Sequence, residues 1–233
     1  MKKITIEIFT DVLCIWAYGA QARIDQLKAD YGEQVVLRHR LIPIFAAARH
    51  RIETDWSSKG GYAAFNRHLH QLASAWKHVE MHADVWLQDA PESSQVAHLY
   101  LKALQLLEAR AELAPTSVAG FNGRSLVEEY AWRVRRAFFA QARNISRMTT
   151  LDAVAEELDI PVDAVHQLID TGAAHAALHQ DTAVRDRYQV SGSPTLVFNE
   201  GRQHLYGNIG YRIIDANIRE LLHDRQFGEA SWC

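Results

Sequence analysis

The chain contains little cysteine and little proline. Only two of its 233 residues are cysteines and five are prolines. Two cysteines cannot form a disulfide-rich scaffold, and they cannot supply a four-cysteine zinc site. Such sparse cysteine use is typical of a protein that works in a reducing compartment, so we expect the cytoplasm.

Long apolar runs are also missing. The first residues alternate polar and apolar side chains and include Glu7, so the apolar region of a signal peptide is absent. No stretch approaches the roughly 20 apolar residues that a membrane-spanning helix needs. We therefore expect neither secretion through such a signal nor a membrane anchor within this sequence.

Positive charge is not in excess. The 25 lysines and arginines face 28 aspartates and glutamates, which gives a formal net charge of -3. Nucleic-acid-binding domains and polybasic membrane surfaces carry a clear excess of basic residues. We expect no nucleic-acid partner and no membrane partner.

Strand patterns occur at both ends of the sequence. Isoleucines at every second position from Ile4 to Ile8 are typical of a strand. Apolar residues at helical spacing follow over 20–31, and a second strand is predicted over 35–42. Two short strands, 195–198 and 203–206, flank a turn and predict a hairpin before a last helix. A βαβ unit and a ββα unit thus enclose the middle of the chain and are expected to share one sheet.

The middle of the chain predicts helix over almost all of residues 62–190. Polar, glycine-containing segments predict loops at 51–61 and 113–123. The fold class is therefore α/β, with a large all-helical insertion. We divide the chain into an N-terminal βαβ part at 1–55, a helical insertion at 56–188, a C-terminal ββα part at 189–224 and a tail at 225–233.

Cys14 is the most informative residue, because it lies where the first strand is predicted to end and a helix to begin. Unpaired backbone N–H groups and the helix dipole favour negative charge at a helix N-terminus. The thiolate is the reactive form of cysteine. This placement predicts a thiol pKa below the free value.

A second feature lies near the other end of the chain. In the run Val190-Ser191-Gly192-Ser193-Pro194-Thr195, the proline stands at the start of a predicted strand. Proline is tolerated there, and an X-Pro bond can be cis in a tight, specified turn.

These two runs together resemble a known family. Asp11-Val12-Leu13-Cys14-Ile15-Trp16-Ala17-Tyr18-Gly19 is similar to the pattern Asp-x-x-Cys-Pro-Trp-Cys-Tyr-x-Gly of the DsbA-like thioredoxin-fold proteins, especially their FrnE-like branch. The late run resembles that family's Val-x-Gly-x-Pro segment. Kappa-class glutathione transferases and 2-hydroxychromene-2-carboxylate isomerases share the architecture. The resemblance spans roughly residues 4–222 and implies a thioredoxin fold with an inserted helical domain.

The resemblance also implies roles for single residues. Cys14 matches the nucleophile, and Pro194 matches the cis-proline beside its sulfur. Ser193 matches the residue whose backbone pairs with an extended substrate or with glutathione. Trp16 and Tyr18 are expected to border that groove. The implied partners are a small-molecule thiol or a protein thiol or disulfide; no cofactor is required, and glutathione enters as a co-substrate.

Two departures from the family pattern limit this chemistry. Ile15 replaces the proline of the motif, and Ala17 replaces its second cysteine. A dithiol enzyme resolves a mixed disulfide with that second sulfur. In this chain an external thiol, or another cysteine, must do so.

Several residues keep two interpretations each. Asp11 is either an acid or base near the thiol or a carboxylate that caps the following helix. Cys233 is either an exposed spectator at the chain end or, less simply, a resolving thiol. The run Arg133, Arg135 and Arg136 is expected to be a solvated face.

The 12 histidines invite a metal interpretation. His78 and His82 are four residues apart, as are His175 and His179, so each pair could share a helix face. No third ligand stands at a recognisable spacing. We expect no metal site.

Three functions fit these observations. The first is an enzyme, a single-cysteine thiol-disulfide oxidoreductase that acts through mixed disulfides. The second is a glutathione-dependent isomerase or transferase, which needs no second cysteine. The third is a thioredoxin-fold binding module without catalysis. The sequence leaves a homodimer open.

Overall fold

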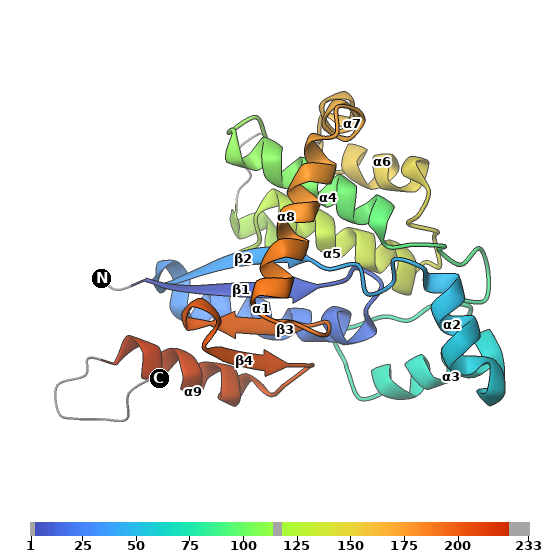
Figure 1. The fold of residues 1–233 in the computed structure, drawn as a ribbon, viewed down its shortest axis with the longest axis horizontal. Coiled ribbons are helices and arrows are strands. Elements are labelled where there is room, and N and C mark those ends of the chain that lie inside the picture. Colours follow the sequence, from blue (N-terminus) through green and yellow to red (C-terminus); the bar gives the residue numbers. More distant parts are fainter. Residues whose placement is uncertain (1–2, 114–117, 224–233) are drawn as a thin grey trace.

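A four-stranded sheet joins the two ends of the chain. The computed structural model describes residues 3–113 and 118–223. The strands are β1 (Ile4–Thr10), β2 (Val35–Leu41), β3 (Thr195–Phe198) and β4 (Gln203–Tyr206), in the order β2-β1-β3-β4. β1 pairs parallel with β2 and antiparallel with β3, and β3 pairs antiparallel with β4. The predicted single sheet, shared by both chain ends, is therefore confirmed (Figure 1).

Helices fill the rest of the described chain. Those with α-helical geometry are α1 (Ile15–Tyr31), α2 (Ala48–Trp56), α3 (Gly61–Ala73), α4 (Gln95–Ala109), α5 (Leu126–Phe139), α6 (Met148–Glu156), α7 (Val162–Asp170), α8 (Ala173–Arg187) and α9 (Tyr211–Leu222). Short 3-10 turns lie at Gly32–Gln34, Ser57–Lys59, Val118–Phe121 and Asn199–Gly201. In Figure 1, α4 to α7 form a layer on one side of the sheet, and α8 descends from that layer across the strands. No helix within the described ranges is long and apolar enough to cross a bilayer.

Two predictions for the middle of the chain are wrong. The predicted loop at 51–61 is largely helical, since α2 runs from Ala48 to Trp56. Only Ala48 and Ile52 of that helix are buried, so its apolar stripe was too thin to recognise. The predicted helix is also interrupted between α3 and α4, where Asn66 Nδ2 donates to Val85 O at 2.7 Å and fixes an irregular segment. The predicted domain boundaries stay predictions, and residues 225–233 lie outside the described part.

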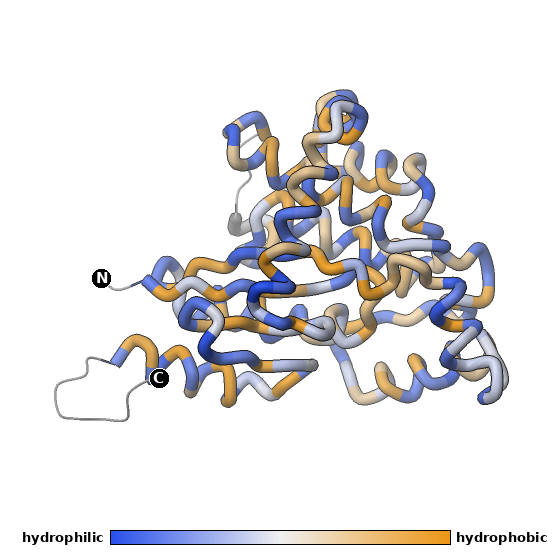
Figure 2. The backbone as a smooth tube through the Cα atoms, in the orientation of Figure 1, coloured by the Kyte–Doolittle hydropathy of each residue, from blue (hydrophilic) through white to orange (hydrophobic). Residues whose placement is uncertain are grey.

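The sheet packs against helices at both faces. Ile4, Ile6 and Ile8 of β1 are buried in a cluster with residues of α1 and α9. Along α9, apolar and polar segments alternate in Figure 2, as expected for a helix that buries one side. Fully burying one such aliphatic side chain stabilises the fold by about 1.5–3 kcal/mol.

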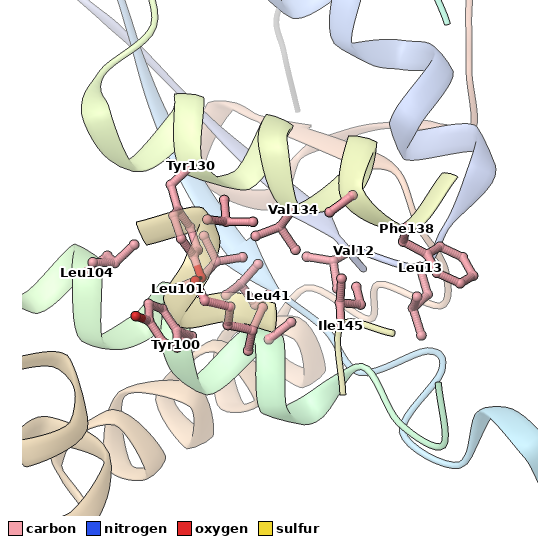
Figure 3. Packing of buried hydrophobic residues seen from close by; sticks show 14 of the residues in the cluster. Val12, Leu13, Leu41, Tyr100, Leu101, Leu104, Tyr130, Val134, Phe138 and Ile145 are labelled. Atoms are coloured by element: carbon pink, nitrogen blue, oxygen red, sulfur yellow. Dashed lines mark hydrogen bonds between the residues drawn. The ribbon is translucent and has the colours of Figure 1, made fainter. Parts of the chain in front are cut away.

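The larger core belongs to the helical layer and reaches the end of β1. Val12 and Leu13 are fully buried in it, together with Tyr100, Tyr130 and Phe138. Figure 3 shows Val12 and Leu13 beside Val134, Phe138 and Ile145. The turn that carries Cys14 is thus anchored between the sheet and the helical layer.

A buried ionic cluster also joins the two parts. Asp181 on α8 accepts from Arg40 Nη1 of β2 at 3.1 Å and from Lys102 Nζ of α4 at 2.9 Å. Its second oxygen also accepts from the backbone N–H of Leu41 at 2.9 Å. Because the carboxylate is fully buried and paired, its loss would leave two cations without their partner.

Candidate functional site

Cys14 occupies the N-cap position of α1. Its backbone is extended, with φ -81 and ψ 115, and its carbonyl accepts from Tyr18 N at 3.0 Å. The helix therefore begins directly after the cysteine, as the sequence predicts. The side chain is only 6% exposed.

The loop before β3 lies against this cysteine. The Ser193–Pro194 peptide bond is cis. Cys14 Sγ donates to Ser193 O at 3.1 Å, although 179 residues separate them. Asp11 N donates to Ser193 Oγ at 2.9 Å. The structure thus brings the two predicted runs into direct contact through Cys14, Asp11 and Ser193.

The pKa of the Cys14 thiol is raised above its ordinary value, which reverses the prediction from the helix N-terminus. Burial is the main cause, because the charged form loses its hydration. Hydrogen bonds from the side chain of Ser193 and from the backbone at Ala17 oppose this rise in pKa, and the negative charge of Asp11 adds to it. In its resting state Cys14 is a protonated thiol.

Asp11 holds the loops around the cysteine in place. Its Oδ1 accepts from Leu13 N at 2.8 Å, and its Oδ2 accepts from Phe45 N and from Ser94 Oγ, both at 2.8 Å. The carboxylate is fully buried. With its oxygens occupied in this way, Asp11 fits the interpretation of a structural carboxylate better than that of a proton acceptor.

His98 on α4 belongs to the same cluster, although nothing in the sequence pattern singled it out. Its Nε2 accepts from Val12 N at 3.2 Å, so the ring proton is on Nδ1. Burial lowers the pKa of His98. The negative charge of Asp11, whose Oδ1 lies 3.7 Å from His98 Nε2, raises this pKa again only in part. No group in the described chain partners Nδ1. His98 is therefore a neutral ring beneath the Cys14 turn.

The two aromatic residues of the motif lie in different places. Trp16 is 39% exposed and packs edge-on against Trp76, with ring centroids 5.6 Å apart. Tyr18 is fully buried, stacks on Phe139 and donates from its hydroxyl to Glu80 O. Trp16 can thus border a ligand at the surface, whereas Tyr18 joins α1 to α5 in the core, away from the expected groove.

Tyr206, at the end of β4, is a site residue that sequence reasoning missed. Its ring lies so close to Gly192 that a Cβ there would come within 2.5 Å of it. Tyr206 is 65% exposed, and Gly207 N donates to Pro194 O at 2.8 Å. An exposed aromatic ring therefore covers the glycine of the cis-proline loop.

Arg135 corrects the prediction of a solvated arginine face. Its side chain is buried, and its Nη2 donates to Thr10 Oγ1 at 3.2 Å. Burial lowers the pKa of Arg135 to about 10. Arg133 and Arg136 are partly exposed and pair with Glu129 and Glu80, respectively. The sequence carries no signal that separates the inward arginine from its neighbours.

The remaining predicted groups lie away from this site. The His78 ring lies 2.8 Å from Gly19 O, and His82 Nδ1 accepts from Asp84 N at 3.1 Å. Across residues 3–113 and 118–223, no three histidine, cysteine or acidic side chains gather as metal ligands would. Cys233 lies outside the described residues.

The chain is similar to known proteins in sequence and in fold. The chain is 26% identical to the ClpXP adapter protein SpxH of Bacillus subtilis over 96% of its own length and 69% of that protein's. The cytosolic disulfide reductase DsbM of Pseudomonas aeruginosa superposes with a TM-score of 0.62 at 17% identity, covering 93% of this chain and 99% of DsbM. A DsbM structure with GSH gives a TM-score of 0.60.

A 2-hydroxychromene-2-carboxylate isomerase superposes with a TM-score of 0.63 at 16% identity, covering 93% of this chain and 95% of the isomerase. At this identity the likeness shows the fold alone. The family model of the DSBA-like thioredoxin domain matches residues 5–218, which include both the Cys14 turn and the cis-proline loop. The chain belongs to the DsbA-like thioredoxin domain family.

Proposed function

We propose that the protein is a single-cysteine thiol-disulfide oxidoreductase that works through a mixed disulfide with glutathione or a protein thiol. One observation carries this proposal: Cys14 Sγ lies 3.1 Å from Ser193 O of the cis-proline loop, and Ala17 stands where the family has its second sulfur. Disulfide chemistry occurs among the proteins that share this fold, such as the disulfide reductase DsbM. The single sulfur restricts it to exchange with an external thiol.

The exchange takes two steps. Cys14 first releases its proton to solvent, and the thiolate attacks one sulfur of a substrate disulfide. The substrate S–S bond breaks, a mixed disulfide forms at Cys14, and the leaving thiolate takes up a proton. A second thiol then loses its proton and attacks the mixed disulfide, which returns Cys14 as a thiol. No further cofactor is needed.

The exposed aromatic rings support a bound thiol compound with an extended backbone. Trp16 lies in the first turn of α1, and Tyr206 covers Gly192 next to Ser193. Backbone groups of the segment before β3 can pair with an extended chain, as in strand addition. Glutathione fits these requirements, and the fold shared with DsbM, which has been crystallised with GSH, agrees with that choice. A reducing cytoplasm, where glutathione is abundant, is the proposed setting.

The raised pKa of Cys14 sets a condition for this activity. Because the resting thiol is buried and hydrogen-bonded to Ser193 O, the substrate must displace that contact before the sulfur can react. We therefore propose slow exchange with small free disulfides. Exchange is faster with substrates whose backbone pairs with the segment at Ser193.

The test uses the variant Cys233→Ser, which leaves Cys14 as the only cysteine. After incubation with oxidised glutathione, intact mass spectrometry should show one glutathionyl group, and reduced glutathione should remove it. The matched control Cys14→Ser, Cys233→Ser should show none. If no adduct forms even above the ordinary thiol pKa, the oxidoreductase proposal fails.

A second candidate is a protein-binding adapter that does not use the thiol. The buried, protonated state of Cys14 favours it, and so does the 26% identity to the adapter SpxH. Partner capture by this protein should then survive Cys14→Ser at unchanged affinity. An oxidoreductase that traps partners through mixed disulfides loses them in the same variant.

A glutathione-dependent isomerase is the third candidate. It also needs a single sulfur, and it shares the fold of 2-hydroxychromene-2-carboxylate isomerase. In that case glutathione binds reversibly without forming a mixed disulfide. Calorimetry with reduced glutathione on the Cys14→Ser variant separates this outcome from exchange.

A further inference from the structure

A cavity lies between β2 and the helices α1, α4 and α5. Its volume is about 770 Å³, within the range of roughly 300–1,000 Å³ for small-molecule sites. None of Cys14, Trp16, Ser193 and Pro194 lines it. The cavity therefore has its own lining, although Arg135 interacts electrostatically with Asp11 and Cys14 of the candidate thiol site.

Regular structure builds the apolar walls of this cavity. Val127, Ala131 and Arg135 line it from α5 at spacings of four residues, which is one face of a helix. Leu37 of β2 and Leu101 of α4 lie in other walls. These aliphatic side chains share the lining with polar ones, among them Gln21, Gln105 and Glu108, so a ligand would contact both kinds.

Arg135 is the unusual group in the lining. It is 6% exposed, and its Nη2 donates to the neutral hydroxyl of Thr10. Its Nε is buried without a partner, and no acidic side chain in the described chain forms an ion pair with it; the Asp11 carboxylate acts on it only at longer range. Buried cations are normally paired directly, because removing a charge from water is costly.

The other basic side chains of the lining all have acidic partners. Lys28 pairs with Glu128, Arg38 with Glu7, and Lys102 with Asp181. Arg40 bridges Glu7 and Asp181. Among the described residues, each of these cations has a direct acidic partner, whereas Arg135 has only the more distant charge of Asp11.

We propose that this cavity binds a small organic carboxylate with an apolar body, whose carboxylate pairs with Arg135. The guanidinium offers its Nε and a neighbouring Nη as a fork that matches two carboxylate oxygens. The aliphatic walls accept the rest of the molecule. A single cation suits one carboxylate better than a multiply charged phosphate, and the proposal does not depend on any reaction at Cys14.

The test measures binding to the full chain by isothermal titration calorimetry. The probes are octanoate and 2-naphthoate, each compared with its neutral amide. At least one carboxylate should bind saturably, and its amide should bind at least about tenfold more weakly, which corresponds to about 1.4 kcal/mol. If neither carboxylate binds, or if amide and carboxylate bind equally well, the proposal is overturned.

Variants locate the binding. Arg135→Met should weaken the carboxylate at least about tenfold, whereas Arg136→Met, which changes a partly exposed neighbour paired with Glu80, should leave it unchanged. Ala131→Phe keeps the arginine but fills the cavity, and it should also abolish binding. If Arg135→Met does not fold, the test depends on Ala131→Phe. Undiminished carboxylate binding in that variant overturns the proposal. Equal weakening in Arg136→Met and Arg135→Met overturns it as well.

Discussion

The thiol of Cys14 donates its hydrogen bond to the backbone carbonyl of Ser193, across 3.1 Å and 179 residues of sequence. A carbonyl oxygen can accept from a thiol but cannot donate to a thiolate. This contact therefore favours the protonated sulfur in the free protein. Its consequences can be measured without knowledge of the substrate.

The first prediction concerns the pH dependence of Cys14. Because burial raises its pKa above the ordinary value, iodoacetamide should label the folded Cys233→Ser variant more slowly than a free cysteine at neutral pH. Labelling should accelerate only above the ordinary thiol pKa, and urea should restore the normal rate. A profile with its midpoint below that value would contradict the structure.

The same shift predicts a loss of stability at high pH. Above the ordinary thiol pKa the unfolded chain releases the proton while the folded chain keeps it, so the free energy of unfolding falls as the pH rises. Urea denaturation at a series of pH values compares the Cys233→Ser variant with the Cys14→Ala, Cys233→Ser variant. Above the ordinary thiol pKa, the free energy of unfolding should fall more steeply with pH in the variant that keeps Cys14.

Ser193→Ala should destabilise the fold by about 1–3 kcal/mol. The substitution removes the hydroxyl that accepts from Asp11 N, and that buried N–H then has no acceptor. Urea denaturation measures the change. Ser191→Ala, at an exposed position of the same loop, is the matched control. Its free energy of unfolding should stay close to that of the unchanged protein.

His98 should make the protein sensitive to mild acid. Burial lowers the pKa of His98 below its ordinary value of 6.5, so the unfolded chain binds a proton first as the pH falls. The free energy of unfolding should therefore decrease as the pH drops below that ordinary value. His98→Gln should flatten this dependence, whereas His175→Gln, at an exposed position, should preserve it.

Gly19→Ala tests the support of Trp16. An added Cβ would lie 2.5–2.9 Å from ring atoms of Trp76, so that ring must move. We expect a loss of about 1–3 kcal/mol, as for other overpacked sites, and a change in tryptophan fluorescence. Gly210→Ala meets nothing within 4 Å and should leave both properties unchanged. An unaltered Gly19→Ala variant would show that the Trp76 ring does not lie against Gly19.

The sequence predicted the sheet and the helix start at Cys14 because both depend on short-range patterns. Alternating isoleucines in β1 and turn residues before β4 are local signals. The pairing of Cys14 with Pro194 came from the family resemblance, since no local pattern links residues so far apart. The cis bond agrees with that resemblance, and the hydrogen bond from Cys14 to Ser193 O is what the structure adds to it.

Other features depend on what packs against a residue, which the sequence does not state. Arg135 follows the same helical pattern as its exposed neighbours, yet α5 turns it toward Thr10. The thiol pKa was predicted in the wrong direction because the helix N-terminus was considered without the burial of Cys14. His98 reaches the site from α4 because of the tertiary fold alone.

During synthesis, Cys14 emerges long before the loop that contacts it in the folded protein. β1 is made first, but the loop that contacts Cys14 and β3, the antiparallel neighbour of β1, are made only after the helical layer. At roughly 5–20 residues per second, the intervening 179 residues take about 10–40 seconds to emerge. During this interval the Cys14 thiol lacks its hydrogen-bond acceptor, Ser193 O. The thiol of the nascent chain is therefore more accessible to oxidation or alkylation than that of the folded protein.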